Sequence, residues 1–236
     1  MIIDTHCHFD MMKSPESYIQ EIENKGDIVI GMTNMPSHFK MGVPFVKKYK
    51  HVRLALGLHP LLASEQDNEL ELFKRLLPQT SYIGEVGLDF SRDGYSTKEK
   101  QIKNFEFVLQ CIVNKNKLLS IHSKRAEETV FELLKRYHIS NAIFHWYSGN
   151  LSTLNKILEC NYYFSLNEAM IESSNGKKLI SYMPLNRILT ETDAPFNKKC
   201  NINNVIAYLA KEHNLSIVEI ESTIKTNFYS LINNVQ

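Results

Sequence analysis

The chain has 236 residues, 43% of them hydrophobic, and a formal net charge of +1 at pH 7. These values predict one globular domain over residues 1–236, and they exclude a disordered chain and a basic protein that coats duplex DNA through its charge. The four cysteines form no Cys-x-x-Cys pair and the N-terminus has no signal-peptide pattern, so we expect a cytoplasmic protein with no membrane partner.

Short runs rich in Ile, Val, Leu, Tyr and Phe recur along the chain and predict buried strands. Continuously apolar strands are typical of parallel sheets that are covered on both faces. In chain order the predicted strands are Ile2–His6, Asp27–Met32, Val52–Gly57, Tyr82–Gly87, Leu118–His122, Asn141–His145, Tyr162–Leu166 and Ile188–Glu191.

Longer amphipathic stretches lie between these strands and predict helices, and Ser216 with Glu219 gives the last helix a capping-box pattern. The predicted helices include Pro15–Lys25, Glu65–Leu77, Thr97–Lys115, Glu127–Tyr137, Leu151–Cys160 and Asn203–His213. Eight strand–helix units in a chain of this length predict an α/β fold, a (β/α)8 TIM barrel, whose usual length is about 250 residues. A doubly wound open sheet is the alternative.

Residues with metal-binding side chains stand at the ends of these predicted strands. A lone His-x-His pair such as His6 and His8 is more often surface polarity than a metal site. Because the carboxyl ends of barrel strands share one rim, however, the joint occurrence of such residues predicts a site there. The rim residues are His6, His8, His59, Glu85, His122, His145 and Asp193.

Four of these histidines, all except His59, and the two carboxylates exceed the ligands of one tetrahedral ion. They fit two divalent ions that share a carboxylate. We assign His6, His8 and Asp193 to one ion, and His122 and His145 to the other, with Glu85 as the bridge. The mixed nitrogen and oxygen donors suit Zn²⁺, Mn²⁺, Fe²⁺ or Co²⁺ better than Mg²⁺, and the identity of the ions stays open.

Several motifs, taken in order, resemble the TatD family of metal-dependent deoxyribonucleases, part of the amidohydrolase superfamily. They are His-Cys-His at 6–8, Gly-Leu-His-Pro around His59, Gly-Glu-Val-Gly-Leu-Asp-Phe around Glu85, His122, His145 with Ser148-Gly149, and Glu-Thr-Asp-Ala-Pro around Asp193. The resemblance implies a TIM-barrel hydrolase that holds two divalent metals in the assigned residues and removes nucleotides from DNA, commonly from a 3′ end. The chain also resembles the TatD-like member of the Qat antiphage cassette, which implies a role in antiphage defence with protein partners.

The chain departs from the family pattern near the expected phosphate contacts. Leu61 stands where the family commonly has a second histidine, and Lys124, followed by Arg125, stands where it usually has an arginine. A lysine offers a point charge instead of a planar fork. The segment after Pro195 is also shorter than usual. These differences affect the range of substrates and leave the predicted metal ligands intact.

In the predicted reaction, Glu85 and Asp193 are catalytic, since Asp193 orients the attacking water and accepts its proton while Glu85 bridges the ions. We expect His59, Lys124 and Arg125 to contact phosphate oxygens. The other candidate substrate contacts are Lys198 and Lys199, which as adjacent lysines equally fit a solvated surface, and aromatic residues after strand ends that could stack a base, namely Phe9, Phe90, Trp146 and Phe196. Trp146 equally fits a buried position between barrel and helices.

Three functions follow from this pattern. The first is a DNase, a 3′-end exonuclease on DNA, with single strands or 3′ ends as the substrate. The second is a two-metal hydrolase of amides or esters, such as lactones or aminoacyl-tRNA, because the same activated water can attack carbon. The third is a non-catalytic, metal-stabilised subunit of an assembly.

Overall fold

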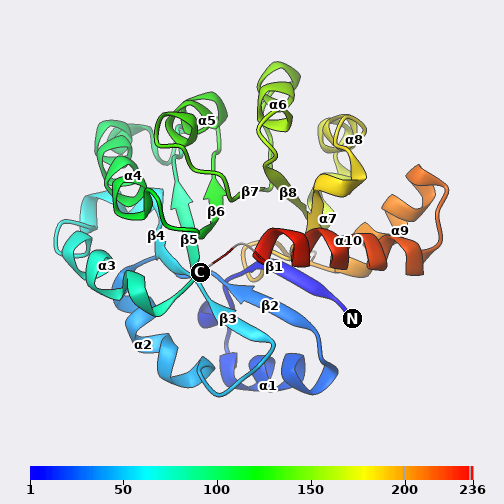
Figure 1. Cartoon of the computed structure of the whole chain (residues 1–236), viewed down its shortest axis with the longest axis horizontal. Coiled ribbons are helices and arrows are strands. Elements are labelled where there is room, and N and C mark those ends of the chain that lie inside the picture. The colour runs from blue at the N-terminus through cyan, green and yellow to red at the C-terminus, as the bar shows by residue number, and fades with distance from the viewer. Residues whose placement is uncertain (199, 234, 236) are drawn as a thin grey trace.

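The computed structural model describes residues 1–198, 200–233 and 235, in which parallel strands alternate with helices (Figure 1). The strands are β1 (Ile3–Cys7), β2 (Ile28–Gly31), β3 (Val52–Leu54), β4 (Leu56–Leu58), β5 (Tyr82–Gly87), β6 (Leu118–His122), β7 (Ala142–His145), β8 (Tyr163–Leu166) and β9 (Ile188–Thr190). The helices are α1 (Pro15–Lys25), α2 (Pro36–Val46), α3 (Leu70–Leu76), α4 (Lys98–Ile112), α5 (Glu127–Arg136), α6 (Leu151–Leu158), α7 (Glu168–Glu172), α8 (Ser174–Ile180), α9 (Ile202–His213) and α10 (Ile217–Ile232).

The strands form two parallel sheets whose spatial order follows the chain, β1-β2-β3 and β4 to β9. A doubly wound sheet reverses its strand order at a switch point, so this order excludes that alternative. Among the described residues no ladder pairs β9 with β1, but their side chains and flanking backbone are bonded. The Thr5 hydroxyl donates to Thr190 O over 3.0 Å, and the Thr190 hydroxyl donates to Ile3 O over 2.5 Å. The first and last strands therefore lie side by side.

The predicted strand Val52–Gly57 is interrupted at Ala55 and forms β3 and β4. Ala55 N donates to Gly31 O over 2.7 Å, and Ala55 O accepts a hydrogen bond from the Thr33 hydroxyl over 2.8 Å. The Thr33 hydroxyl thus takes the place of a backbone donor to Ala55 O, and the regular strand ladder is interrupted at this point. The same chain segment joins the two sheets.

Some helices differ from the sequence prediction. The predicted helix Glu65–Leu77 forms as α3, which begins only at Leu70, and the 3₁₀ segment Pro60–Glu65 precedes it. Helix α2 was not predicted, because Pro36, Gly42 and Pro44 give its sequence the character of a loop. The short helices α7 and α8 were also missed, since neither is long enough for a hydrophobic period to stand out.

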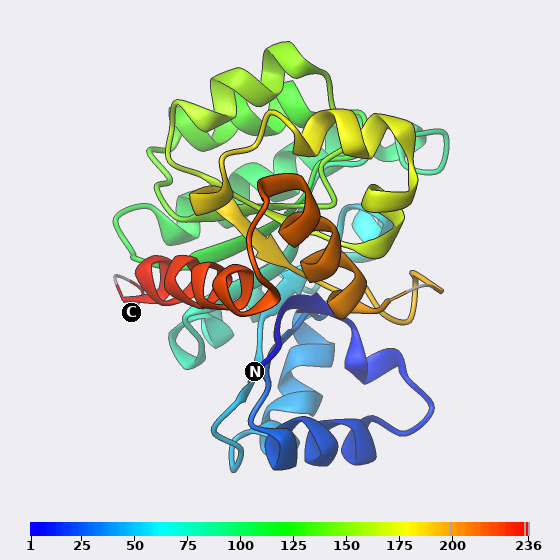
Figure 2. The same ribbon diagram turned by 90° about the vertical axis from the view of Figure 1, so that its right-hand side faces the viewer.

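The strands are buried, and the helices form an arc around them (Figure 1). In Figure 2, α9 and α10 lie between the yellow α8 and the blue N-terminal elements. The predicted capping box of α10 is confirmed, because the Ser216 hydroxyl accepts from Glu219 N while the Glu219 carboxylate accepts from Ser216 N. None of the helices in the described part of the chain has both the length and the apolar character needed to cross a bilayer.

Candidate metal centre

The predicted rim residues converge at the carboxyl ends of the strands. Backbone hydrogen bonds between β1 and the segment after β9 fix part of this arrangement. Asp193 N donates to His6 O over 2.9 Å, and His8 N donates to Ala194 O over 2.8 Å. Residues far apart in the sequence therefore meet because the first and last strands are neighbours, and the Asp193 carboxyl is held beside the two histidines of β1.

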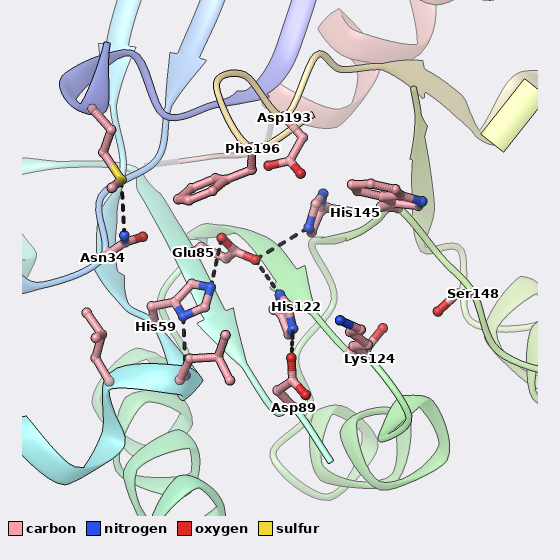
Figure 3. Close-up of a pocket in the computed structure, with 15 residues that line it drawn as sticks. Asn34, His59, Glu85, Asp89, His122, Lys124, His145, Ser148, Asp193 and Phe196 are labelled. Atoms are coloured by element: carbon pink, nitrogen blue, oxygen red, sulfur yellow. Dashed lines mark hydrogen bonds and ion pairs between the residues drawn. The ribbon is translucent and has the colours of Figure 1, made fainter. Parts of the chain in front are cut away.

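Glu85, on β5, lies at the centre of the cluster (Figure 3). Its Oε2 atom is 3.0 Å from His8 Nε2 and 3.5 Å from His6 Nε2. Its Oε1 atom is 2.6 Å from His122 Nδ1 and 3.4 Å from His145 Nε2. The two carboxylate oxygens thus face two different histidine pairs, which is the arrangement required of a carboxylate that bridges two cations.

Asp193 completes the side of the cluster that contains His6 and His8. Its Oδ1 atom is 3.8 Å from His6 Nε2 and 4.0 Å from His8 Nε2, and the two imidazole nitrogens are 3.3 Å apart. These three residues have donor atoms close enough together to hold one metal ion. Converging imidazole nitrogens and carboxylate oxygens are the donors that Zn²⁺, Mn²⁺ and related ions prefer, so the residues fit such an ion.

Burial and neighbouring charge shift the protonation of these groups. Burial raises the pKa of Glu85, but the surrounding imidazoles of His59, His6 and His122 outweigh it and hold that pKa well below its usual range. Burial lowers the pKa of His6 to about 3, so its imidazole is neutral, as a metal ligand must be. Burial raises the pKa of Asp193 to about 7, although the His145 charge opposes the shift.

Comparison with known proteins decides the family. The model of the TatD-related DNase family matches residues 3–233. The chain belongs to this family. Similar proteins include a metal-dependent hydrolase of Methanocaldococcus jannaschii, 25% identical over 95% of this chain and 94% of its own length. The human deoxyribonuclease TATDN3 is 23% identical over 98% of this chain and 94% of its own length.

Solved TatD structures agree with this assignment. The crystal structure of YjjV, a TatD homolog from Escherichia coli, is 26% identical and superposes with a TM-score of 0.87 over 98% of both chains. A TatD-family hydrolase from Entamoeba histolytica, 16% identical, has the same fold with a TM-score of 0.80 over 98% of this chain and 97% of its own. The predicted TIM-barrel-type fold is confirmed. The chain is thus a metal-dependent hydrolase of the TatD type.

A cavity of about 610 Å³ opens above the candidate metal centre. Its outer wall is largely apolar and includes Met11, Leu61, Trp146 and Phe196. Among the described lining residues, Lys124 is the one lysine or arginine. Met11, Leu61 and Phe196 are 50%, 40% and 55% exposed, so these apolar side chains face solvent at the entrance. The cavity therefore combines a polar floor with an apolar entrance.

His59 lies between the floor and the entrance. Its Nδ1 atom accepts a hydrogen bond from Leu61 N over 3.2 Å, and a backbone amide can only donate. The imidazole proton is therefore on Nε2, which lies 3.3 Å from Glu85 Oε2. Burial lowers the pKa of His59, so the ring stays neutral. Although His59, Glu85 and His122 are close enough to hold a metal, this tautomer makes His59 a hydrogen-bond donor at the cavity.

Not all predicted substrate contacts reach the cavity. His59, Lys124, Trp146 and Phe196 line it, whereas Arg125 and Lys198 are exposed outside it. The expectation that Phe9 contacts a base is wrong, because its ring is 3% exposed and packs in the core against Gly31.

The expected contact from Phe90 is likewise not found at the cavity. The Phe90 ring packs against the core, with Lys98 Nζ 4.7 Å from its centroid. Lys199, also predicted as a substrate contact, lies outside the described residues. The aromatic residues at the entrance are thus Trp146 and Phe196.

Sequence reasoning missed three polar residues that contact the predicted ligands from behind. Asp89 Oδ2 accepts from His122 Nε2 over 2.8 Å, Glu191 Oε1 accepts from His145 Nδ1 over 3.1 Å, and Ser120 Oγ lies 2.7 Å from His6 Nδ1. Asp89 and Glu191 belong to the motifs around Glu85 and Asp193. Ser120 stands two residues before His122 and so shares its face of the strand, which is a signal that period-2 analysis could have used.

Proposed function

We propose that residues 1–236 act as one domain that binds two divalent metal ions and hydrolyses phosphodiester bonds in DNA, removing nucleotides from a 3′ end. One observation carries this proposal. The Glu85 oxygens face two separate histidine pairs, and Asp193 lies beside the first pair. His6, His8 and Asp193 would hold one ion, and His122 and His145 the other. Two ions in this position supply a water of lowered pKa and neutralise charge on phosphoryl oxygens.

The side chains around the ions have separate roles in the proposed reaction. The Asp193 carboxylate orients the attacking water and accepts its proton, because its Oδ1 atom faces the cluster. The His59 Nε2–H group, 3.3 Å from Glu85 Oε2, donates to a phosphate oxygen bound beside Glu85. Lys124, at the cavity wall, supplies a positive charge to the backbone of the strand. Preorganised donors of this kind stabilise charge that grows in the transition state.

The shape and charge of the cavity support a strand end as substrate. Proteins that bind duplex DNA neutralise several phosphates with lysine and arginine, whereas this cavity offers one lysine among its described lining residues. Trp146 and Phe196 offer aromatic faces on which an unstacked base can lie. We therefore propose single-stranded DNA or a frayed 3′ end as the substrate.

The apolar entrance also supports a second candidate, the hydrolysis of an ester or amide whose acyl group contacts Met11, Leu61 and Phe196. The same activated water attacks a carbonyl carbon in that case. Lactones and aminoacyl-tRNA are examples of this substrate class. The two candidates differ in whether the cavity receives a base or an acyl chain.

The test uses single- and double-stranded oligonucleotides labelled at the 5′ end, incubated with Mg²⁺, Mn²⁺ or Zn²⁺. We expect a ladder that shortens from the 3′ end, faster on single strands, and no products after chelation or with Asp193→Asn. Immediate release of the 5′ label as a mononucleotide, without a ladder, would overturn the polarity. A protein that binds metal but releases no nucleotide with any ion would overturn the nuclease, and turnover of esters in the same sample would favour the second candidate.

We further propose that the reaction serves antiphage defence in the cytoplasm, together with protein partners, on the strength of the motifs alone. Phage should form fewer plaques on cells that carry the wild-type chain and its neighbouring genes than on cells that carry the same genes with Asp193→Asn. Equal protection by the two proteins would favour a non-catalytic subunit. No protection by either protein would exclude the defence role and leave the enzymatic proposal intact.

A further inference from the structure

The two histidine pairs of the metal centre have different surroundings. On the first side, the outer nitrogen of His6 contacts the neutral hydroxyl of Ser120 at 2.7 Å. The outer nitrogen of His8, Nδ1, is buried and has no hydrogen-bond partner among the described residues. The acidic group on this side is Asp193 itself, whose Oδ1 atom lies 3.8 Å from His6 Nε2.

On the second side, both histidines contact a carboxylate with their outer nitrogens. His122 donates to Asp89 over 2.8 Å, and His145 donates to Glu191 over 3.1 Å. Asp89 and Glu191 are each 1% exposed. In the described part of the chain, the first side has no such pair of buried acids behind its imidazoles.

Both acids are held rigidly by other groups. Ser91 N donates to Asp89 Oδ1 over 2.8 Å, which leaves Oδ2 for His122. The Glu191 carboxylate accepts hydrogen bonds from Asn167 Nδ2 over 2.8 Å and from the Ser165 hydroxyl. A carboxylate held by several donors fixes the orientation of the imidazole that it contacts.

We propose that Asp89 and Glu191 are positioning residues for the second metal ion, the ion assigned to His122 and His145. This inference rests on the two-metal site proposed above. Each acid keeps the imidazole proton on the nitrogen that it contacts. His122 Nδ1 and His145 Nε2, which face Glu85 Oε1, then carry no proton and can bind the metal ion through their lone pairs. The acids also make these imidazoles more basic ligands, which compensates for the lack of a carboxylate that belongs to the second ion alone.

The experiment measures metal content and affinity, not activity. Wild type, Asp89→Asn and Glu191→Gln are dialysed against graded Zn²⁺ and Mn²⁺, and bound metal is counted by mass spectrometry. We expect two equivalents in wild type. In each variant one equivalent should bind about 10- to 100-fold more weakly, while the other keeps its affinity. Both substitutions preserve the size of the side chain, and circular dichroism checks that each variant is folded.

Asp4→Asn is the matched control. Asp4 is a buried carboxylate that bonds to Thr192 and His6 N, and it has no hydrogen bond to His122 or His145 among the described residues. The Asp4→Asn variant should bind the second equivalent of metal with wild-type affinity. Ser120→Ala tests the opposite side, because it removes the group behind His6 and should weaken only the first equivalent.

Two results would overturn the inference while the two-metal proposal stands. In one, wild type binds two equivalents and both variants retain wild-type affinities. In the other, the variants weaken both equivalents together, as general destabilisation would do. A wild-type protein that binds fewer than two equivalents would instead contradict the two-metal proposal itself.

Discussion

The floor of the cavity and its entrance, the mouth, differ in polarity and in exposure to solvent. The floor consists of Glu85, His122, His145 and Asp193, which contact the fully buried His6 and His8, and the mouth consists of Met11, Leu61, Lys124, Trp146 and Phe196. Most floor residues are buried, and their side chains contact one another at 2.6 to 4.0 Å. Apart from Lys124 the mouth is apolar, and most of its side chains are exposed.

This difference follows from the elements that carry the residues. Floor residues stand on strands or directly after them, and the backbone pairing fixes their positions. Mouth residues stand on connecting segments, where changes in sequence cost little stability. The floor therefore determines the chemistry that this hydrolase performs, and the mouth determines which molecules reach it. If the two regions act separately, substitutions in the floor change metal binding and kcat, whereas substitutions in the mouth change KM.

Glu85→Gln gives the largest expected effect. The variant keeps the shape of the side chain but removes the charge that both histidine pairs face. We expect both metal equivalents to weaken and kcat on DNA to fall by about 10⁴-fold, the scale found when an essential catalytic group is removed. Metal analysis and single-turnover rates check this. A variant that keeps both ions and most of its activity would show that Glu85 is not the bridge.

His59→Ala tests the boundary between the regions. The His59 Nε2–H group faces Glu85 Oε2 at 3.3 Å, and in the proposed reaction it donates to a phosphate oxygen. Removing one such donor should lower kcat by about 10²-fold while two metal ions remain bound. Leu61→Ala, at the adjacent mouth, is the control and should keep kcat. Loss of one metal equivalent in His59→Ala would instead make His59 a ligand.

The sequence predicted most of the floor because strand periodicity and the barrel rule together place residues on a common rim. His6, His145 and Asp193 could be assigned from their positions at strand ends alone. Asp89 and Glu191 could not, because a carboxylate in a motif does not reveal which histidine it contacts. That contact depends on the registers of two different strands.

The mouth could be predicted only in part. Phe9 and Phe196 both follow strand ends, yet Phe9 packs over Gly31, whose lack of a side chain leaves room for the ring. Phe196, after β9, instead points into the cavity (Figure 3). Whether an aromatic residue in a loop turns inward or outward depends on neighbours distant in sequence. The interruption at Ala55, caused by the Thr33 hydroxyl, has the same kind of origin.

Phe196→Ala should alter substrate binding without altering the floor. The Phe196 ring lies 4.9 Å from the His8 ring, centroid to centroid, and is 55% exposed. Because stacking on an aromatic side chain contributes about 1–3 kcal/mol per base, we expect KM for single-stranded DNA to rise about tenfold with kcat and metal content unchanged. Phe196→Trp should restore KM, and Tyr182→Ala, at an exposed tyrosine outside the cavity, should have no effect.

An oligonucleotide with an abasic 3′-terminal residue makes this test sharper. If the ring stacks on the terminal base, wild type and Phe196→Ala should bind this substrate equally. If the substitution weakens binding to the abasic end as much as to the normal one, the ring contacts the backbone or only shapes the cavity. Stacking as the role of Phe196 would then be wrong.

Lys124→Ala gives the smallest expected effect, because Lys124 is exposed and water screens its charge. We expect KM to rise about two- to fivefold, within the range of an exposed ion pair. The plot of log(kcat/KM) against log salt should become shallower by about 0.7, the value for one phosphate contact on a single strand. Lys124→Arg should keep the slope, and so should Arg125→Ala, since Arg125 lies outside the cavity. An unchanged slope in Lys124→Ala would mean that the mouth holds its substrate through apolar contacts alone, which would favour an ester or amide over DNA.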